Sequence, residues 1–352
     1  MKYTEQYWND VRKSINSIPE VQSLFGKNIL VTGANGMICS SVIDILLLLN
    51  KEYHAGITIL AAGRSEARMT TRFPGLGEDD GFRFVYYDAT SQDGVDLDNQ
   101  VDYIIHGASN ANPAIYMKEP VDTILANIIG LNAMLNTAKT KGSKRILYIS
   151  SSEVYGQNSS MEPYKEGDYG YLDILGQRSG YPSSKRTGES LCVAYGMQHG
   201  TDTVIVRPGH IYGPTITKTD NRATAQFARN GVVGENIVMK SKGEQKRSYC
   251  YTLDCASAIL AVLIKGEKDN AYNISNPHSI CTIREIAEEI ARASNVEIVF
   301  ECATEAENKS YNTMQNSSLD STKLESLGWI PAFSLQEGVA SMMKTMKAEV
   351  QG

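Results

Sequence analysis

The sequence predicts an α/β protein with a doubly wound parallel sheet, followed by a smaller mixed C-terminal lobe. From Lys27 onward, short β-branched runs alternate with helical stretches, which is the order of a parallel sheet covered by helices on both faces. After Gly213-Pro214 the elements become shorter and mixed, which indicates a second lobe. A chain of 352 residues with 42% hydrophobic and 21% charged residues is long enough to fold both.

The expected elements follow from apolar periodicity and from the glycine and proline residues between them. The expected strands are Asn28–Thr32, Ile57–Ala61, Phe82–Tyr87, Val101–His106, Arg145–Ser150 and Thr203–Val206. The expected helices between them are Met37–Asn50, Pro120–Lys141 and Tyr181–His199, and later ones lie near Arg222–Asn230, Leu253–Lys265, Ile283–Ala293 and Ser334–Met346. The segment from Phe73 to Asp80 is expected to be a loop.

Composition and charge exclude several classes of function. The net charge of −6 and the absence of a long basic run argue against nucleic-acid binding. The longest apolar run, Val42 to Leu49, is interrupted by Asp44 and is far shorter than the roughly 20 residues that cross a bilayer. The six cysteines form no CxxC pair and stand at no metal-ligand spacing from the five histidines, so we expect reduced thiols and no metal. A signal-like N-terminus is absent, and we expect a cytoplasmic protein.

A glycine turn follows the first expected strand and opens the first long helix. Gly33 and Gly36 permit tight turning and close backbone approach, and the helix N-terminus then holds a pyrophosphate. This strand, turn and helix therefore predict a dinucleotide site of the Rossmann type. Its expected binding residues are Gly33, Asn35, Gly36, Met37 and Ile38. Cys39 stands where a third glycine is usual.

The sequence leaves the choice between NAD and NADP open, although we expect NAD. No acidic residue ends the second strand to bind the ribose 2′-hydroxyl of NAD. Arg64 either accepts a 2′-phosphate or stacks on adenine, with Glu66 as a substitute carboxylate. Asp88 and Ala89 end the third strand, where they either read the adenine edge or form an ordinary strand end.

Tyr181 and Lys185 have the spacing of a catalytic pair. Residues four apart lie on one face of a helix, and a lysine ammonium beside a phenol is expected to lower the phenol pKa from about 10. The tyrosinate then takes a proton from a hydroxyl as hydride leaves the carbon. The pair is specific here because it follows the glycine turn and the Ser150–Gly156 segment.

Three segments carry a resemblance to the extended short-chain dehydrogenases, which spans residues 28 to about 346. His106–Met117 resembles HLASPASPPNYM, Ser152–Gly156 resembles TSEVYG, and Gly176–Arg186 resembles GPRSCYDEGKR, all of the UDP-glucuronate decarboxylase (UDP-xylose synthase) family. The resemblance implies a redox-neutral decarboxylation of a UDP-sugar in a homodimer. The likeness in helices Pro120–Lys141 and Tyr181–His199 implies the dimer contact, with Ile124, Ile128, Leu131 and Leu135 as an apolar stripe that either faces a partner or is buried in the monomer.

The resemblance also implies site residues. Tyr181 is the base, Lys185 its support, Ser152 a hydrogen-bond donor to the C4 oxygen and Glu153 a carboxylate near C5. The substrate contacts expected with them are Ser109, Asn110, Tyr116, Arg178, His210 and Arg247. The further cofactor contacts are Gly107, Ala108, Ser109, Asn127 and Pro208. Arg207 has the character of a structural ion pair more than of a ligand.

Departures from the family pattern keep other reactions open. His210 replaces the usual asparagine of the RxxNxYGP segment, and Ser317 replaces the arginine of a later Arg-x-x-Asp. A 4,6-dehydratase, a 4-epimerase and a catalytically silent cofactor-binding scaffold are the alternatives. The expected domains are a helical extension at 1–26, with Tyr7, Val11 and Ile15 on one face, an NAD(P)-binding domain at 27–207, and a mainly substrate-binding lobe at 208–352 from which some segments return to the first domain.

Overall fold

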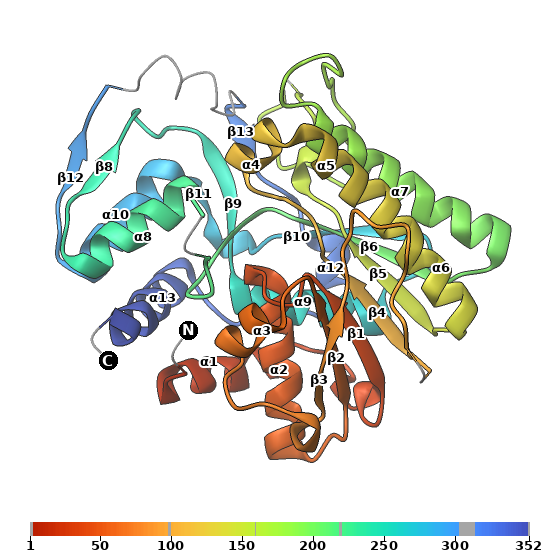
Figure 1. The fold of residues 1–352 in the computed structure, drawn as a ribbon. Coiled ribbons are helices and arrows are strands. Elements are labelled where there is room, and N and C mark those ends of the chain that lie inside the picture. Colours follow the sequence, from red (N-terminus) through yellow and green to blue (C-terminus); the bar gives the residue numbers. More distant parts are fainter. Residues whose placement is uncertain (1–2, 98–99, 159, 218–219, 303–313, 351–352) are drawn as a thin grey trace.

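A seven-stranded parallel sheet forms the centre of the molecule. The computed structural model describes residues 3–97, 100–158, 160–217, 220–302 and 314–350 (Figure 1). The strand order is β10-β6-β5-β4-β1-β2-β3. The strands are β1 (Asn28–Thr32), β2 (Thr58–Gly63), β3 (Phe82–Tyr86), β4 (Tyr103–His106), β5 (Arg145–Ile149), β6 (Thr203–Pro208) and β10 (Asn270–Ile274). The six expected strands and the Rossmann-type fold are confirmed, and β10 was not predicted.

Helices cover both faces of the sheet. On one face, α2 (Met37–Tyr53) packs with α9 (Thr252–Lys265), and on the other, α6 (Leu131–Lys141) packs with α7 (Gly180–His199). Because side chains alternate along a strand, Ile29 belongs to the first apolar core and Leu30 to the second. Both are fully buried. Burial on two faces explains the continuous apolar runs in the sequence.

The predicted helix Pro120–Lys141 is interrupted by a different helical turn. It consists of α5 (Pro120–Leu125), a π-helical turn at Ala126–Gly130 and α6. Such turns often mark functional sites, and this one carries Asn127. The short helices α3 (Glu66–Arg72) and α4 (Pro113–Lys118) were not predicted, and the expected loop at 73–80 contains a 3₁₀ turn at Glu78–Asp80.

The later half of the chain forms a second lobe beside the sheet (Figure 1). Its larger sheet joins β7 (His210–Tyr212), β9 (Lys246–Tyr251), β11 (Ile280–Thr282) and β13 (Asn316–Ser317), and its smaller one pairs β8 (Ile237–Met239) with β12 (Ile298–Phe300). Its helices are α8 (Ala223–Val233), α10 (Ile283–Ser294) and α13 (Leu335–Val350). Three segments after residue 207 belong instead with the seven-stranded sheet: β10 is one of its strands, α9 packs on it, and α12 (Thr322–Glu325) contacts β10.

The N-terminal helix α1 (Glu5–Ile15) contacts both lobes. Tyr7, Val11 and Ile15 are buried, as the four-residue spacing predicts. The Tyr7 hydroxyl donates a hydrogen bond of 2.5 Å to Asp44 of α2, while Lys13 forms an ion pair of 2.9 Å with Glu337 of α13. The extension therefore packs against both halves. No helix among the described residues has the length and apolarity that a bilayer span requires.

Candidate active site

The glycine turn has the geometry of an anion cradle. Gly33 has φ of 68°, and a Cβ there would lie 2.9 Å from the carbonyl carbon and oxygen of Gly107. Gly36 is the N-cap of α2 and supplies no side-chain hydrogen bond. The first N–H groups of a helix have no acceptor within the helix, so those of Met37 and Ile38 are available to a phosphate. The residues present therefore fit a dinucleotide.

Cys39 takes the place of the third glycine without opening the turn. A Cβ on Gly107 would come within 2.3 Å of the Cys39 sulfur, so the thiol fills the space that Gly107 leaves. Burial raises the pKa of the Cys39 thiol to about 12, which keeps it protonated. The neighbouring turn is fixed by Thr32, whose hydroxyl oxygen accepts hydrogen bonds of 3.2 Å from the backbone N–H groups of Gly107 and Ala108.

Several buried polar atoms lack a partner within the described part of the chain. Among them are the Ser109 hydroxyl and the Asn127 side-chain oxygen. The Asn127 amide nitrogen donates a hydrogen bond of 2.9 Å to the Ser184 hydroxyl, which lies on the helix that also carries Tyr181 and Lys185. Because buried polar groups are normally satisfied, these two atoms are suited to a polar ligand.

Arg64 and Asp88 follow β2 and β3, where the adenosine end of a dinucleotide was expected. The Asp88 carboxylate accepts hydrogen bonds from the Thr90 N–H and hydroxyl, at 2.9 and 2.8 Å. These bonds, and more weakly the Arg64 charge, lower the Asp88 pKa. The local turn matches the reading of Asp88 as an ordinary strand end, and one carboxylate oxygen takes part in it. The expected roles of Arg64, Asp88 and Ala89 stay predictions.

The Tyr181 phenol and the Lys185 ammonium share one face of α7. The Lys185 nitrogen donates a hydrogen bond of 2.8 Å to the Ile149 carbonyl. It lies 5.8 Å from the centre of the Tyr181 ring. Burial lowers the Lys185 pKa to about 7. Burial, and then the Glu153 charge, raise the Tyr181 pKa. The expected lowering of the phenol pKa by Lys185 is therefore wrong for this structure, since desolvation of the phenol outweighs it.

Ser151, which the sequence analysis did not single out, is the serine beside Tyr181. Its hydroxyl lowers the pKa of Tyr181. Ser151 also caps the 3₁₀ turn Ser152–Tyr155 by accepting a hydrogen bond of 3.2 Å from the Glu153 N–H. Ser152 is the first residue of that turn and is partly exposed. The role assigned to Ser152 stays a prediction, and Ser151 is the better placed hydroxyl.

Tyr116, Glu153 and Arg178 form a polar cluster against the base. The Arg178 guanidinium donates a hydrogen bond of 2.8 Å to the Tyr116 hydroxyl and lies 3.8 Å from the Glu153 carboxylate. The Tyr116 hydroxyl lies 3.5 Å from the same carboxylate. Burial raises the Glu153 pKa, whereas Arg178 and then the Tyr116 hydrogen bond lower it. The three predicted residues thus meet beside Tyr181.

In the second lobe, Arg247 and His210 lie on one face of the sheet formed by β7, β9 and β13. Arg247 is 3% exposed and is paired in register with Ser317, while His210 is paired with Tyr249. The only hydrogen bond that Arg247 donates within the described chain goes to the Lys246 carbonyl, at 2.8 Å. The His210 Nδ1 and the Ser317 hydroxyl are buried without a described partner. A buried guanidinium beside two unpaired polar groups calls for an anion.

Burial lowers the His210 pKa to about 3, with Arg247 and Arg222 adding to the effect. The imidazole is therefore neutral at neutral pH. Arg207, in contrast, is bound within the protein: its guanidinium donates 2.9 and 2.6 Å to the two oxygens of Glu189 and 3.0 Å to the Tyr155 hydroxyl. This supports its interpretation as a structural ion pair.

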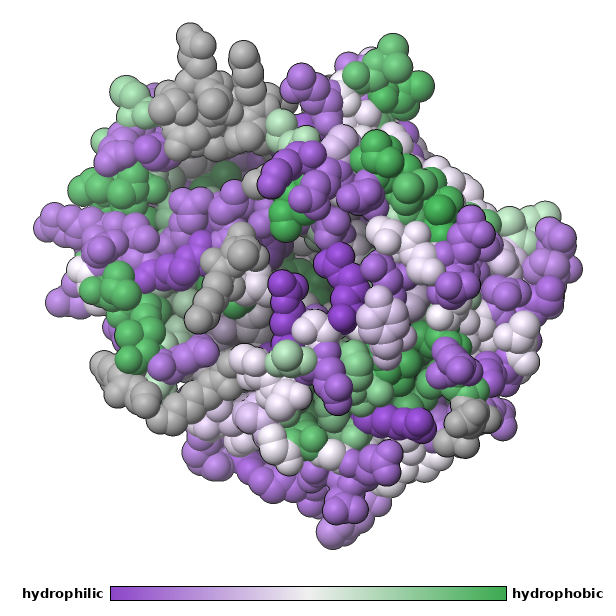
Figure 2. All heavy atoms as spheres, viewed as in Figure 1, coloured by the Kyte–Doolittle hydropathy of each residue, from purple (hydrophilic) through white to green (hydrophobic). Residues whose placement is uncertain are grey.

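The remaining predicted residues follow the carboxyl ends of the central strands. Gly107 to Asn110 come directly after β4, and Pro208 ends β6. Ligands of open α/β sheets bind at this edge. Figure 2 shows a hollow in the middle of the face, with hydrophilic residues around it. The contacts predicted for Asn110 and Pro208 stay predictions.

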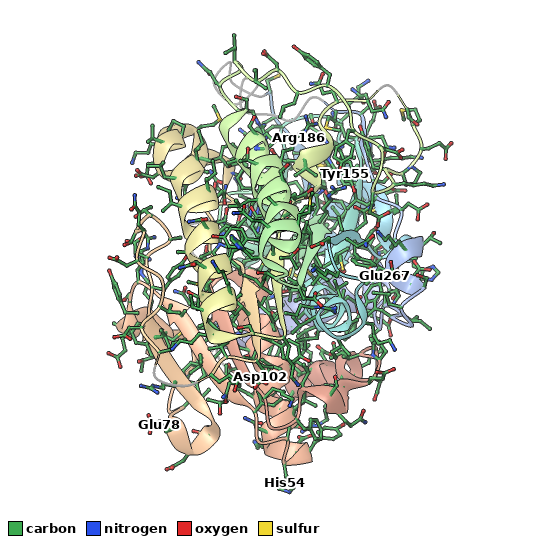
Figure 3. The ribbon with its side chains drawn as sticks, turned by 90° about the vertical axis from the view of Figure 1, so that its right-hand side faces the viewer. His54, Glu78, Asp102, Tyr155, Arg186 and Glu267 are labelled. Carbon is green, nitrogen blue, oxygen red and sulfur yellow. The ribbon has the colours of Figure 1, made fainter. Side chains whose placement is uncertain are left out.

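A separate cavity of about 700 Å³ lies at the opposite end of the sheet. Its lining includes His54, Glu78 and Trp8. In Figure 3, His54 and Glu78 lie at one end of the molecule, and Tyr155 and Arg186 lie near the other. Because Tyr155 ends the turn that carries Glu153, this cavity is remote from the catalytic cluster. Among the described residues no group of acids, cysteines and histidines is arranged for a metal.

The cradle, the Tyr-Lys pair and the buried anion site together have the character of a dinucleotide-dependent enzyme. The chain belongs to the NAD-dependent epimerase/dehydratase family, which matches residues 29–275. It is 32% identical to UDP-glucuronic acid decarboxylase 6 of Arabidopsis thaliana, over 89% of this chain and 87% of the relative. UDP-glucuronic acid decarboxylase 1 of Xenopus tropicalis is 30% identical, over 99% of this chain and 79% of that protein.

Solved structures agree with the fold. A UDP-glucose 4-epimerase of Thermotoga maritima has a TM-score of 0.76 and 23% identity, covering 92% of this chain and 99% of that one. An epimerase of Methanothermobacter thermautotrophicus has a TM-score of 0.80 and 18% identity, covering 95% and 96%. At these identities the likeness concerns the architecture. Together with the family match and the two decarboxylase relatives, this fold confirms the resemblance to the extended short-chain dehydrogenases.

Proposed function

We propose that this protein is a nucleotide-sugar enzyme that resembles UDP-glucuronate decarboxylase and uses tightly bound NAD for transient oxidation at C4. The carboxylate of Glu153 beside the Tyr181 base is the observation that carries this proposal. A 4-epimerase needs one acid-base group at C4, whereas decarboxylation and dehydration need a second proton transfer at C5. Both relatives reported above are named UDP-glucuronic acid decarboxylases, which favours decarboxylation.

The protein groups account for each proton. Tyr181 takes the proton of the C4 hydroxyl in its deprotonated, tyrosinate form, whose formation the neighbouring Ser151 hydroxyl favours by lowering the Tyr181 pKa. When bound at the glycine turn of Gly33 and Gly36, NAD would supply the hydride chemistry at C4, both the initial oxidation and the final reduction. The resulting β-keto acid loses carbon dioxide as the bond from C5 to the carboxylate breaks and its electron pair moves into the C4-C5 enolate. Glu153, whose pKa is raised, then donates a proton to C5, and Tyr181 returns its proton to the C4 oxygen.

Arg247 supports a nucleotide diphosphate as the end of the substrate that stays attached to the sugar throughout the reaction. Its guanidinium is buried and short of acceptors, and a diphosphate supplies oxygens in the geometry that guanidinium groups bind. His210 and Ser317 offer the unpaired polar atoms beside it. We propose that Arg247, His210 and Ser317 all bind this diphosphate. Arg178 is then the group closest to the sugar carboxylate.

The most direct test is incubation with UDP-, dTDP-, GDP- and CDP-sugars, including UDP-glucuronate, followed by mass spectrometry. The proposal expects loss of carbon dioxide from UDP-glucuronate. Loss of water would instead identify a 4,6-dehydratase, and unchanged mass with a new sugar spectrum a 4-epimerase. A protein that binds NAD but converts no sugar would be a cofactor-binding scaffold. Tyr181→Phe is the inactive control, and NAD released by denaturation checks the cofactor against NADP.

A homodimer and a cytoplasmic location are further proposals. Exposed apolar side chains lie on α5 and α7, which pack side by side: Val121 is 64% exposed and Met197 82%. Leu131 and Leu135 of the expected stripe are instead fully buried in the monomer. All six cysteines are free, which suits a reducing compartment. Sedimentation of the protein with Val121→Lys, against wild type, tests the dimer.

A further inference from the structure

The ring of Tyr148, on β5, faces the ammonium group of Lys185. Lys185 is 2% exposed, and its nitrogen lies 4.7 Å from the centre of the Tyr148 ring, closer than it lies to the Tyr181 ring. The same nitrogen donates its hydrogen bond to the carbonyl of Ile149, the next residue of the strand. The face of an aromatic ring carries partial negative charge and attracts a cation at this distance. The strand therefore offers the ammonium both a carbonyl oxygen and a ring face.

The titratable groups around Lys185 do not replace this contact. Within the described residues Lys185 forms no ion pair. Glu189, one helical turn further along α7, raises the Lys185 pKa, but its carboxylate oxygens also accept hydrogen bonds of 2.9 and 2.6 Å from Arg207. The thiols of Cys39 and Cys192 are protonated, because burial raises the pKa of each. The buried ammonium therefore shares its nearest carboxylate with another cation, and burying a charge is costly unless other groups stabilise it.

The surroundings of Tyr148 hold its ring against α7 and leave its hydroxyl without a role. His106, paired with Tyr148 in register, lies nearly parallel to it, with 6.0 Å between ring centroids and 20° between planes. Burial, and then the Lys185 charge, lower the His106 pKa to about 3, so this imidazole brings no second positive charge. A Cβ on Gly188 would lie 2.6 Å from the Tyr148 oxygen, so the glycine lets the ring approach the helix. The Tyr148 hydroxyl is buried with no partner among the described residues.

We propose that Tyr148 is a positioning residue that keeps Lys185 in its ammonium form through the face of its ring. This role rests on the function proposed above for Tyr181 as the base at C4. An ammonium beside the phenol favours the tyrosinate relative to a neutral amine in the same place. Burial lowers the Lys185 pKa to about 7, so the ring acts where a modest loss of stabilisation changes the charge at neutral pH.

The test measures the charge of Lys185 directly and needs no sugar turnover. NAD-loaded protein that contains lysine labelled with carbon-13 at Cε is titrated by NMR, and the Lys185 signal is assigned by its absence in Lys185→Met. Tyr148→Phe keeps the ring and should leave the Lys185 pKa unchanged. Tyr148→trifluorophenylalanine keeps the shape but depletes the negative charge of the ring face. We expect it to move the equilibrium from ammonium toward amine by about tenfold, which lowers the Lys185 pKa.

The pH profile of kcat gives a second readout. Activity that needs the ammonium declines as pH rises through the Lys185 pKa, so the decline should begin at lower pH in Tyr148→trifluorophenylalanine and coincide with wild type in Tyr148→Phe. The same fluorinated residue in place of Tyr86, a ring that is 66% exposed on β3, is the control and should change neither readout.

Equal Lys185 pKa values in Tyr148→Phe and the fluorinated variant would overturn the proposal. If the fluorinated variant does not fold, Tyr148→Leu takes its place, and a Lys185 pKa equal to that of Tyr148→Phe would again overturn it. Because the NMR titration uses no sugar, a failure to convert UDP-glucuronate would contradict the proposed reaction without changing this result.

Discussion

The Tyr116 ring lies almost parallel to the Tyr181 ring, with 5.0 Å between centroids and 8° between planes. The two tyrosines come from α4 and α7, far apart in the sequence. The stack fixes the orientation of the base, and the Tyr116 hydroxyl joins it to Arg178 and Glu153. One aromatic residue therefore connects the C4 base with the group proposed to act at C5.

Tyr116→Phe should lower kcat about tenfold with little change in protein stability. The ring and its stack remain, but the hydroxyl that bridges Arg178 and Glu153 is lost, and one such hydrogen bond is worth about 1 kcal/mol or somewhat more. Tyr116→Leu, which also removes the stack, should lower kcat further. Steady-state kinetics on the identified substrate checks both. Tyr195→Phe, which removes an exposed hydroxyl bonded to Asn132, is the control. Equal rates for Tyr116→Phe and wild type would separate the stack from catalysis.

Arg178→Gln should move the pH profile of kcat toward higher pH. Burial raises the Glu153 pKa and the Arg178 charge lowers it, so removing the cation raises that pKa further and keeps the carboxyl protonated to higher pH. Arg178→Lys retains a charge and should shift the profile less. Glu153→Gln should remove the corresponding limb altogether. A limb that persists in Glu153→Gln belongs to another group.

Gly107→Ala should destabilise the protein, and Cys39→Gly should relieve part of the loss. The new Cβ would lie 2.3 Å from the Cys39 sulfur, a clash typical of overpacking, which costs about 1–3 kcal/mol. Cys39→Gly alone costs about 0.3 kcal/mol through helix propensity, in addition to the lost packing of the buried thiol, and serves as the reference. Urea unfolding of the two single variants and the double variant gives the coupling. Strictly additive losses would show that the thiol and Gly107 do not compete for space.

Glu189→Gln should cost about 3–5 kcal/mol of unfolding free energy. The change leaves the Arg207 guanidinium buried without its carboxylate, and side chains at this ion pair are at most 10% exposed. The exposed pair of Arg284 with Glu288 provides the comparison, since Glu288→Gln should cost less than about 1 kcal/mol. Denaturant unfolding measures both. A small loss for Glu189→Gln would mean that water reaches Arg207.

Local sequence patterns predicted the elements whose burial depends on a repeating apolar face. The strand β1 is one example, because Ile29 and Leu30 are each buried on one side of the sheet. The strand β10 was not predicted because the polar residue Asn273 interrupts its apolar pattern. That residue is buried only because its side chain is hydrogen-bonded to Tyr155, to the Tyr164 carbonyl and to the Asp320 carbonyl, all distant in sequence.

The sequence predicted which residues form the candidate site, but it did not predict which of them contact one another. Three consecutive serines precede Glu153, and only the 3₁₀ turn decides that Ser151 is the one whose hydroxyl lowers the Tyr181 pKa. The π-helical turn at Asn127 leaves no sequence signature. Arg222 lies in no motif, and its approach to Met37 depends on how the two lobes pack. Such relationships need the fold, because each joins residues from separate elements.

The central claim is tested most directly by the conversion of UDP-glucuronate in heavy water, followed by mass spectrometry and NMR of the product. The account predicts a UDP-pentose that has lost carbon dioxide, carries one deuterium at C5 from the Glu153 carboxyl, and forms without net consumption of NAD. A product that retains the carboxylate, whether dehydrated or epimerised, would contradict decarboxylation as the reaction of this site.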